Sequence, residues 1–179
     1  MRRALPVFAA LLVLSGGIAR AALSAGASAP DFTAQAALGG KDFSFSLADA
    51  LKKGPVVLYF YPKSFTRVCT DEAHLFAENM DDFAKFNASV IGVSADTIAT
   101  QREFSSLECR DRFPVAADPD RAIIKAYDVG SDASPFARRV SYVIAPDGKV
   151  LSSVADPGAE KHIRSALDAL KAWKGDKRS

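Results

Sequence analysis

The stretch PVVLYFYP at residues 55–62, continued by KSFTRVCT at residues 63–70, carries the clearest structural signal in the chain. The first part is β-branched and aromatic without polar alternation, which predicts a strand buried on both faces of a parallel or mixed sheet. The second part leads into a segment with apolar residues at helical spacing, which are expected in the core: Leu75, Phe76, Met80, Phe83 and Phe86. A helix that follows such a strand begins at the strand's carboxyl end, where nucleophiles and ligand sites gather in α/β sheets.

Strand and helix patterns alternate through the rest of the chain. Ser46 is placed to cap a short helix after a strand at 41–47, and Thr97 or Asp96 to cap a helix at 97–108. Further segments are expected as a strand at 89–95, a strand at 113–118, a helix at 119–128, a hairpin at 139–156 and a helix from about 157 onward. This order predicts one α/β domain over residues 31–175, with three layers and a central mixed sheet flanked by helices.

Residues 1–21 have the features of a secretory leader. Arg2 and Arg3 precede an uncharged apolar stretch, and the small residues Ala19 and Ala21 flank Arg20. Proline, serine and glycine interrupt the apolar stretch and leave it short of the roughly 20 residues that a membrane span needs. We therefore expect cleavage near Ala21, a flexible lead-in at 22–30, secretion to the periplasm, and no stable membrane insertion after cleavage.

Removal of the leader changes the charge of the protein. The full chain carries a net charge of +2, and residues 1–21 contain three arginines and no acid, so the mature chain carries −1. The basic character therefore comes partly from the leader, and nothing indicates a nucleic-acid partner. About 158 residues remain, enough for one domain with a sizeable core.

Cys69 is the first candidate for chemistry. At a helix N-terminus, backbone N–H groups and the helix dipole stabilise a thiolate, which is the nucleophilic form of cysteine. An inert buried cysteine is the competing interpretation. Pro62, Thr66 and Cys69 stand in the pattern P-x-x-x-T-x-x-C, and Thr66 by itself could simply cap the helix.

With this pattern the chain resembles the peroxiredoxins of the AhpC/TSA superfamily, most closely their Q-type branch, the bacterioferritin-comigratory proteins. The segments at 28–35, 90–96, 113–130 and 138–150 also resemble that branch in order and approximate spacing. The resemblance implies a thioredoxin-like fold and a thiol-dependent peroxidase without cofactor or metal. Its substrate would be hydrogen peroxide or an organic hydroperoxide, its reductant an external thioredoxin-like thiol or dithiol protein, and its state a monomer or weak dimer.

The resemblance also implies the roles of individual residues. Cys69 would attack the O–O bond and become a sulfenic acid, Thr66 would orient the peroxide, and Pro62 would shield the sulfenate. Arg139 would steady the thiolate and the charge that develops on the peroxide. That role agrees with the chemistry, since displacement at oxygen builds negative charge that a guanidinium stabilises in the transition state. Without the resemblance, Arg138 and Arg139 could equally be a solvated pair.

The chain departs from the Q-type pattern at the second cysteine. Many members carry it five residues after the first, where this chain has His74, and the residues before Cys69 are Arg67 and Val68 in place of Pro-Gly. Cys109 is then a resolving cysteine, a structural disulfide partner, or a spectator thiol in a one-cysteine mechanism. A disulfide with Cys69 needs Cα atoms within about 7 Å and so local unfolding.

Two other function classes compete with the peroxidase. A thiol–disulfide oxidoreductase would share the fold, but the sequence contains no C-x-x-C. A non-catalytic module could keep the scaffold alone. The set of Pro62, Thr66, Cys69 and Arg139 argues against such a module.

Overall fold

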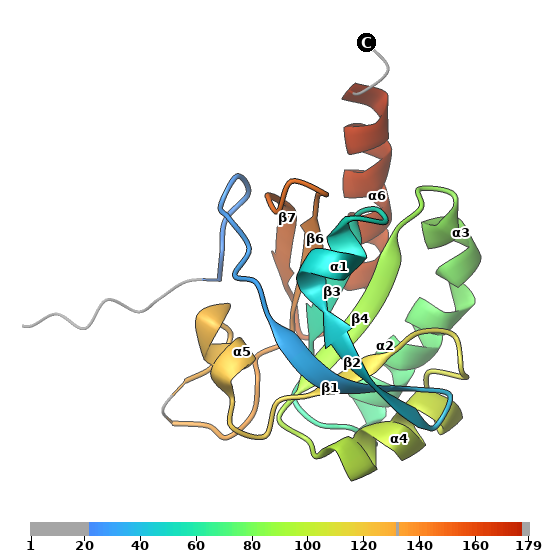
Figure 1. Cartoon of the computed structure of the whole chain (residues 1–179), viewed down its shortest axis with the longest axis vertical. Coiled ribbons are helices and arrows are strands. Elements are labelled where there is room, and N and C mark those ends of the chain that lie inside the picture. The colour runs from blue at the N-terminus through green and yellow to red at the C-terminus, as the bar shows by residue number, and fades with distance from the viewer. Residues whose placement is uncertain (1–21, 132, 177–179) are drawn as a thin grey trace, which may run out of the picture.

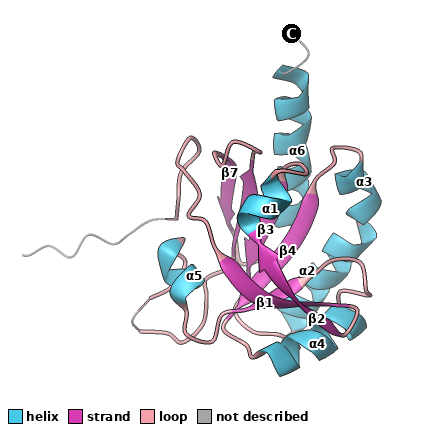
Figure 2. Cartoon of the chain, viewed as in Figure 1, coloured by secondary structure: helices cyan, strands magenta, loops and turns pink. Residues whose placement is uncertain are grey.

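The computed structural model describes residues 22–131 and 133–176, so the predicted leader lies outside the described residues. A seven-stranded sheet in the order β2-β1-β5-β4-β3-β6-β7 forms the centre of the molecule (Figure 1, Figure 2). Its strands are β1 (Thr33–Leu38), β2 (Lys41–Ser46), β3 (Val56–Phe60), β4 (Ser89–Ser94), β5 (Val115–Ala117), β6 (Val140–Ile144) and β7 (Val150–Ala155). The helices are α1 (Leu47–Leu51), α2 (Arg67–Glu78), α3 (Met80–Ala84), α4 (Ile98–Leu107), α5 (Ala122–Ala126) and α6 (Glu160–Asp176).

Helices cover both faces of this sheet and so make three layers. Residues of α1 and α5 pack with the side chains of Val56, Leu58 and Phe60 on one face. Residues of α2, α3, α4 and α6 pack with the alternate side chains of the same strand, including Val57 and Tyr59, on the other face. The predicted three-layer α/β domain with a mixed sheet is confirmed.

The centre of the sheet has the character predicted from residues 55–62. All five residues of β3 are buried, and β3 pairs parallel with β4 and antiparallel with β6. A central strand between two neighbours faces helices on both sides, so both sets of alternate side chains have to be apolar. This strand also carries the chain directly into the segment that precedes Cys69.

The helix caps agree with the sequence. Asp49 N donates to Ser46 Oγ over 3.2 Å at the start of α1, and Thr100 N donates to Thr97 Oγ1 over 3.4 Å at the start of α4. The apolar set after Cys69 was predicted less well. Phe76 and Phe83 are fully buried, whereas the other three only pack against the edge of the core: Leu75, Met80 and Phe86.

The β1 strand was not predicted. Its sequence TAQAAL carries none of the β-branched or aromatic runs that mark a strand, apart from Thr33. Pairing with β2 on one side and with β5 on the other makes it a strand, because neighbouring strands satisfy its backbone whatever its side chains prefer. The lead-in at 22–30, expected to be flexible, forms backbone hydrogen bonds with the β6–β7 hairpin, such as Gly26 N to Val150 O (2.8 Å).

Candidate active site

Cys69 lies in the first turn of α2, directly after the loop that leaves the carboxyl end of β3. Thr66 occupies the N-cap position with an extended backbone (φ −88°, ψ 148°), and Thr70 N donates to Thr66 O over 2.9 Å. The Cys69 side chain is 2% exposed and faces the core side of the helix. The sequence therefore placed this thiol correctly at a helix start.

A buried polar network fixes the loop before the helix. Ser64 N donates to Asp96 Oδ2 over 2.8 Å, and the hydroxyls of Ser64 and Tyr61 donate to Gln101 Oε1 over 3.2 and 2.8 Å. Gln101 in turn donates to the Ala116 carbonyl on β5. Because these groups are buried and paired, the loop is held against α4 and the sheet in one conformation.

Thr66 uses its hydroxyl differently from a simple cap. Its Oγ1 donates to Lys63 O over 2.9 Å, and its side chain makes no capping hydrogen bond to α2. Between them, Phe65 has a left-handed backbone (φ 62°), which is strained for an aromatic residue and is typical of functional loops. The hydroxyl of Thr66 stays exposed beside the start of α2, and Pro62 is half-buried at the base of the loop.

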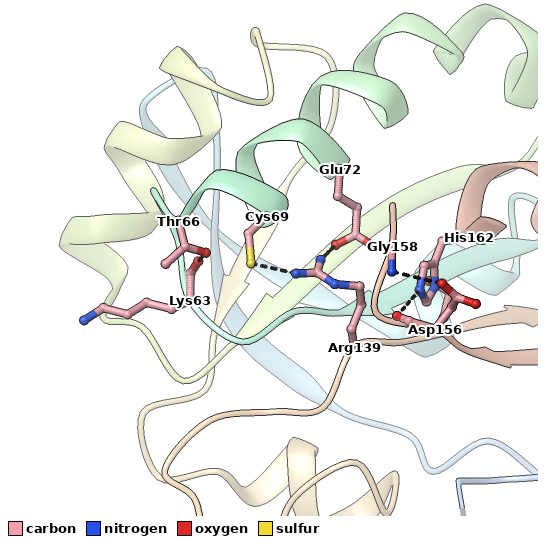
Figure 3. Close-up of polar contacts among 9 residues, drawn as sticks. Lys63, Thr66, Cys69, Glu72, Arg139, Asp156, Gly158 and His162 are labelled. Carbon is pink, nitrogen blue, oxygen red and sulfur yellow. Dashed lines mark hydrogen bonds and ion pairs between the residues drawn. The ribbon is translucent and has the colours of Figure 1, made fainter. Parts of the chain in front are cut away.

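Arg139 reaches Cys69 from the neighbouring strand (Figure 3). The antiparallel register pairs Phe60 with Val140, so the start of β6 lies beside the end of β3, where α2 begins. Arg139 and Cys69 are therefore neighbours although 70 residues separate them. Arg139 Nη2 donates to Cys69 Sγ over 3.1 Å, which excludes the alternative that Arg139 is a solvated surface charge.

Glu72 is the other partner of this guanidinium and was missed from the sequence. Its carboxylate forms an ion pair with Arg139 Nη1, and the Glu72 side chain is fully buried. Burial raises the pKa of Glu72 to about 8, against the lowering effect of Arg139. Its second oxygen, Oε1, is buried without a hydrogen-bond partner. The spacing i, i+3 from Cys69 on the core side of the helix was the available signal, because an acid on a buried face needs a reason.

A buried histidine, His162, lies beside Arg139 (Figure 3). His162 is buried, with Nε2 3.0 Å from the Asp156 carbonyl and Nδ1 2.7 Å from Ser141 Oγ. A carbonyl only accepts, so Nε2 carries the proton and Nδ1 accepts from the Ser141 hydroxyl. Burial first, and then the charge of Arg139, lowers the pKa of His162, which keeps a second positive charge away from the site.

Arg67 does not take part in this arrangement. Its side chain is 85% exposed and lies 3.8 Å from Asp71 on the same helix. The arginine beside the thiol is thus Arg139, which the register of the sheet brings there, whereas Arg67, which is close in sequence, points to solvent.

Cys109 follows the last turn of α4 and belongs to the same buried apolar cluster as Cys69. Both cysteines are free thiols. Burial raises the pKa of Cys109 well above its usual value, and the charge of Glu108 adds to the effect. His74, which stands where many Q-type proteins have a second cysteine, contacts Glu108 with Nε2 2.7 Å from Oε2.

The parts of the chain that the structure describes hold no cluster of three or more His, Cys, Asp or Glu suited to a metal ion. In the same residues no helix is both long and apolar enough to cross a membrane.

Comparison with known proteins gives the family of the chain. The model of the AhpC/TSA family matches residues 25–153. The chain belongs to this family. This peroxiredoxin is 30% identical to peroxiredoxin Bcp of Xanthomonas campestris over 65% of its own length and 76% of that protein. It is 28% identical to the chloroplastic 2-Cys peroxiredoxin BAS1 of Hordeum vulgare, over 82% of this chain and 73% of that protein.

Solved structures agree with the family assignment. The crystal structure of peroxidoxin BcpB from Mycobacterium tuberculosis superposes with a TM-score of 0.77 at 28% identity, covering 84% of this chain and 97% of that one. The thioredoxin-like fold inferred from the resemblance is thereby confirmed, as is the peroxiredoxin assignment, with Bcp-type proteins among the relatives. The chain is a thiol-dependent peroxidase of the oxidoreductase class.

Proposed function

We propose that Cys69 is the peroxidatic cysteine, which reduces hydrogen peroxide or an organic hydroperoxide. The observation that supports this most directly is the 3.1 Å contact between Arg139 Nη2 and Cys69 Sγ. A guanidinium beside sulfur favours the thiolate, and its planar fork leaves further N–H groups for an incoming oxygen. Cys69 is the thiol so placed at a helix start in the described part of the chain, since Cys109 lies after the end of α4.

The proposed reaction is a displacement at oxygen. The Cys69 thiolate attacks the terminal peroxide oxygen, the S–O bond forms as the O–O bond breaks, and the leaving oxygen takes a proton to depart as water or an alcohol. Arg139 stabilises the charge on the two oxygens through its N–H groups, which act most strongly on the transition state. The Thr66 hydroxyl, whose proton goes to Lys63 O, orients the peroxide by accepting its O–H. Pro62 closes the base of the loop and limits the access of water to the sulfenic acid that remains.

We further propose that Cys109 resolves the sulfenic acid and that an external thioredoxin-like thiol protein reduces the resulting disulfide. Both cysteines lie in one apolar cluster beneath α2, which supports an intramolecular Cys69–Cys109 bond after local opening. Peptide mass mapping of peroxide-treated protein should find this disulfide. Sulfenic acid or a mixed disulfide at Cys69 alone would instead indicate a one-cysteine mechanism.

The leader pattern at residues 1–21 supports the proposal that the protein is exported to the periplasm after cleavage near Ala21. The resemblance to Q-type peroxiredoxins supports a monomer or weak dimer, with 31–175 as its one domain. Expression of the full chain followed by N-terminal sequencing of the periplasmic fraction tests the cleavage site. Sedimentation of the mature chain tests the oligomeric state.

Stopped-flow consumption of hydrogen peroxide by the reduced protein tests the central proposal. We expect a fast second-order reaction in wild type and in Cys109→Ser, and none in Cys69→Ser. The two serine variants are a matched pair, because each removes one buried sulfur from the same cluster. A fast reaction that survives in Cys69→Ser would contradict the assignment.

A further inference from the structure

The turn that follows α4 is held to α2 and α3 by one histidine–carboxylate contact and two ion pairs. Glu108 Oε2 lies 2.7 Å from His74 Nε2, and Arg110 Nη1 lies 3.1 Å from Glu78 Oε1. Arg112 pairs with Asp81 at the start of α3. We call these three pairs the 108–112 ladder: His74–Glu108, Glu78–Arg110 and Asp81–Arg112.

The ladder has a regular order that fixes the position of Cys109. Every second residue of the turn, from 108 to 112, contributes one member. Their partners follow one another in the same order along α2 and into α3. Cys109 lies between the first two rungs, and its side chain is 0% exposed in the cluster that also contains Cys69. The charged residues on either side of Cys109 therefore hold the backbone that keeps its sulfur buried.

The same turn is strained. Arg110 (φ 51°) and Asp111 (φ 56°) are consecutive residues with left-handed backbones, and neither is glycine. Backbone hydrogen bonds hold this conformation, from Asp111 N to Ser105 O and from Arg112 N to Cys109 O. Left-handed conformations of non-glycine residues persist only where surrounding contacts impose them. Loss of the ladder contacts would thus remove part of what imposes the left-handed backbone of Arg110 and Asp111, and the turn would lower its conformational energy by opening.

The buried sulfur of Cys109 is poorly suited to attack. Burial raises its pKa, and the neighbouring charge of Glu108 adds to this, so the closed turn holds a thiol and not a thiolate. A disulfide also requires the two Cα atoms to come within about 7 Å with suitable geometry. Opening of the turn meets both needs, since it brings water to the sulfur and frees its backbone.

We propose that the 108–112 ladder is a latch that holds Cys109 out of reaction and sets the rate at which it resolves Cys69. This inference rests on the proposed resolving role of Cys109. When the latch opens, the Cys109 thiolate attacks the sulfur of the Cys69 sulfenic acid and the S–S bond forms. The S–O bond breaks, and the departing hydroxide takes a proton to become water. His74 and Glu108 act in this step as positioning residues.

Two-phase stopped-flow fluorescence of the full chain, started with hydrogen peroxide, separates the two steps. The first, peroxide-dependent phase reports oxidation of Cys69, and the second, peroxide-independent phase reports disulfide formation, which quenched samples verify by peptide mass mapping. Exposed ion pairs are each worth a modest free energy, so Glu78→Gln or Asp81→Asn should speed the second phase about two- to fivefold. The first phase should not change, because neither residue contacts Cys69, Thr66 or Arg139.

Charge reversal sharpens the test. Glu78→Arg places a cation opposite Arg110 and should speed the second phase more than Glu78→Gln does, while Glu78→Arg combined with Arg110→Glu should return it toward the wild-type rate. The control is Asp168→Asn, which removes an exposed ion pair with Lys171 on α6 that is not part of the ladder. It should leave both phases unchanged.

The two phases distinguish a failure of the latch from a failure of the proposed peroxidase function. An unaltered second phase in the Glu78 variants, or an equal acceleration in Asp168→Asn, would overturn the latch. A fast first phase without any Cys69–Cys109 disulfide in wild type would overturn it too, but would leave the peroxidase standing. Loss of the first phase in wild type would instead refute the proposed function itself.

Discussion

Replacement of Glu72 by glutamine tests whether burial or attraction to Arg139 has the larger effect on the pKa of Glu72, the buried carboxyl beside the reacting sulfur. Burial raises the pKa of this carboxyl from about 4.5 to about 8 in spite of the ion pair with Arg139. The folded protein then holds a proton that the unfolded chain releases. The contribution of Glu72 to the unfolding free energy is therefore full below about pH 4.5 and is lost as the pH rises to about 8.

The size of this effect follows from the two pKa values. A difference of about 3.5 pH units, at about 1.4 kcal/mol per unit, corresponds to about 5 kcal/mol lost between pH 4.5 and 8. Glutamine has nearly the same shape as the protonated acid and does not titrate in this range. The stability of wild type relative to Glu72→Gln should accordingly fall with rising pH by up to that amount.

Urea denaturation of both proteins under reducing conditions, at pH values from 4.5 to 8.5, gives this difference directly and cancels the titration of every other group. A flat difference would mean that Glu72 titrates alike in the folded and unfolded chain. A difference that grows in favour of wild type as the pH rises would show instead that attraction to Arg139 outweighs burial and lowers the pKa of Glu72. The rate of peroxide reduction should also fall as the pH rises past about 8. An ionised Glu72 adds a second anion next to Cys69, so this fall should occur in wild type and not in Glu72→Gln.

Substitutions at three further positions have expected outcomes. Arg139→Lys keeps the charge, but one ammonium group cannot replace the planar fork that contacts both Cys69 Sγ and Glu72. The second-order rate constant with peroxide should therefore fall about a hundredfold in a stopped-flow assay. Thr66→Val should lose about as much in the same assay, whereas Thr66→Ser, which retains the hydroxyl, should lose much less. Gly92→Ala would place a Cβ 2.7 Å from the ring of Tyr59; because that ring is fully buried, the unfolding free energy from urea titration should drop by about 1–3 kcal/mol. An unchanged midpoint would show that the ring can move aside.

Local sequence signals were sufficient for most of the fold. The unbroken apolar run at 55–62 identified the central strand, since only a strand covered on both faces has no polar side. Ser46 and Thr97 marked two helix starts, because their hydroxyls meet N–H groups that the helix itself leaves unpaired. The strand at 33–38 could not be found in this way, because its partners in the sheet, and not its own residues, make it a strand.

The sequence alone determined that a thiol stands at a helix start, with Thr66 and Pro62 in the loop before it. The resemblance to peroxiredoxins implied Arg139 beside that thiol, but the residues by themselves left Arg139 open as a solvated charge, and Glu72 was not expected there. The register between β3 and β6 brings Arg139 to the sulfur and leaves nearby Arg67 in solvent. Glu72 becomes the third member because one face of α2 is buried against the sheet. Helical and strand periods are local properties of a chain, whereas contacts across 70 residues depend on how the sheet is assembled.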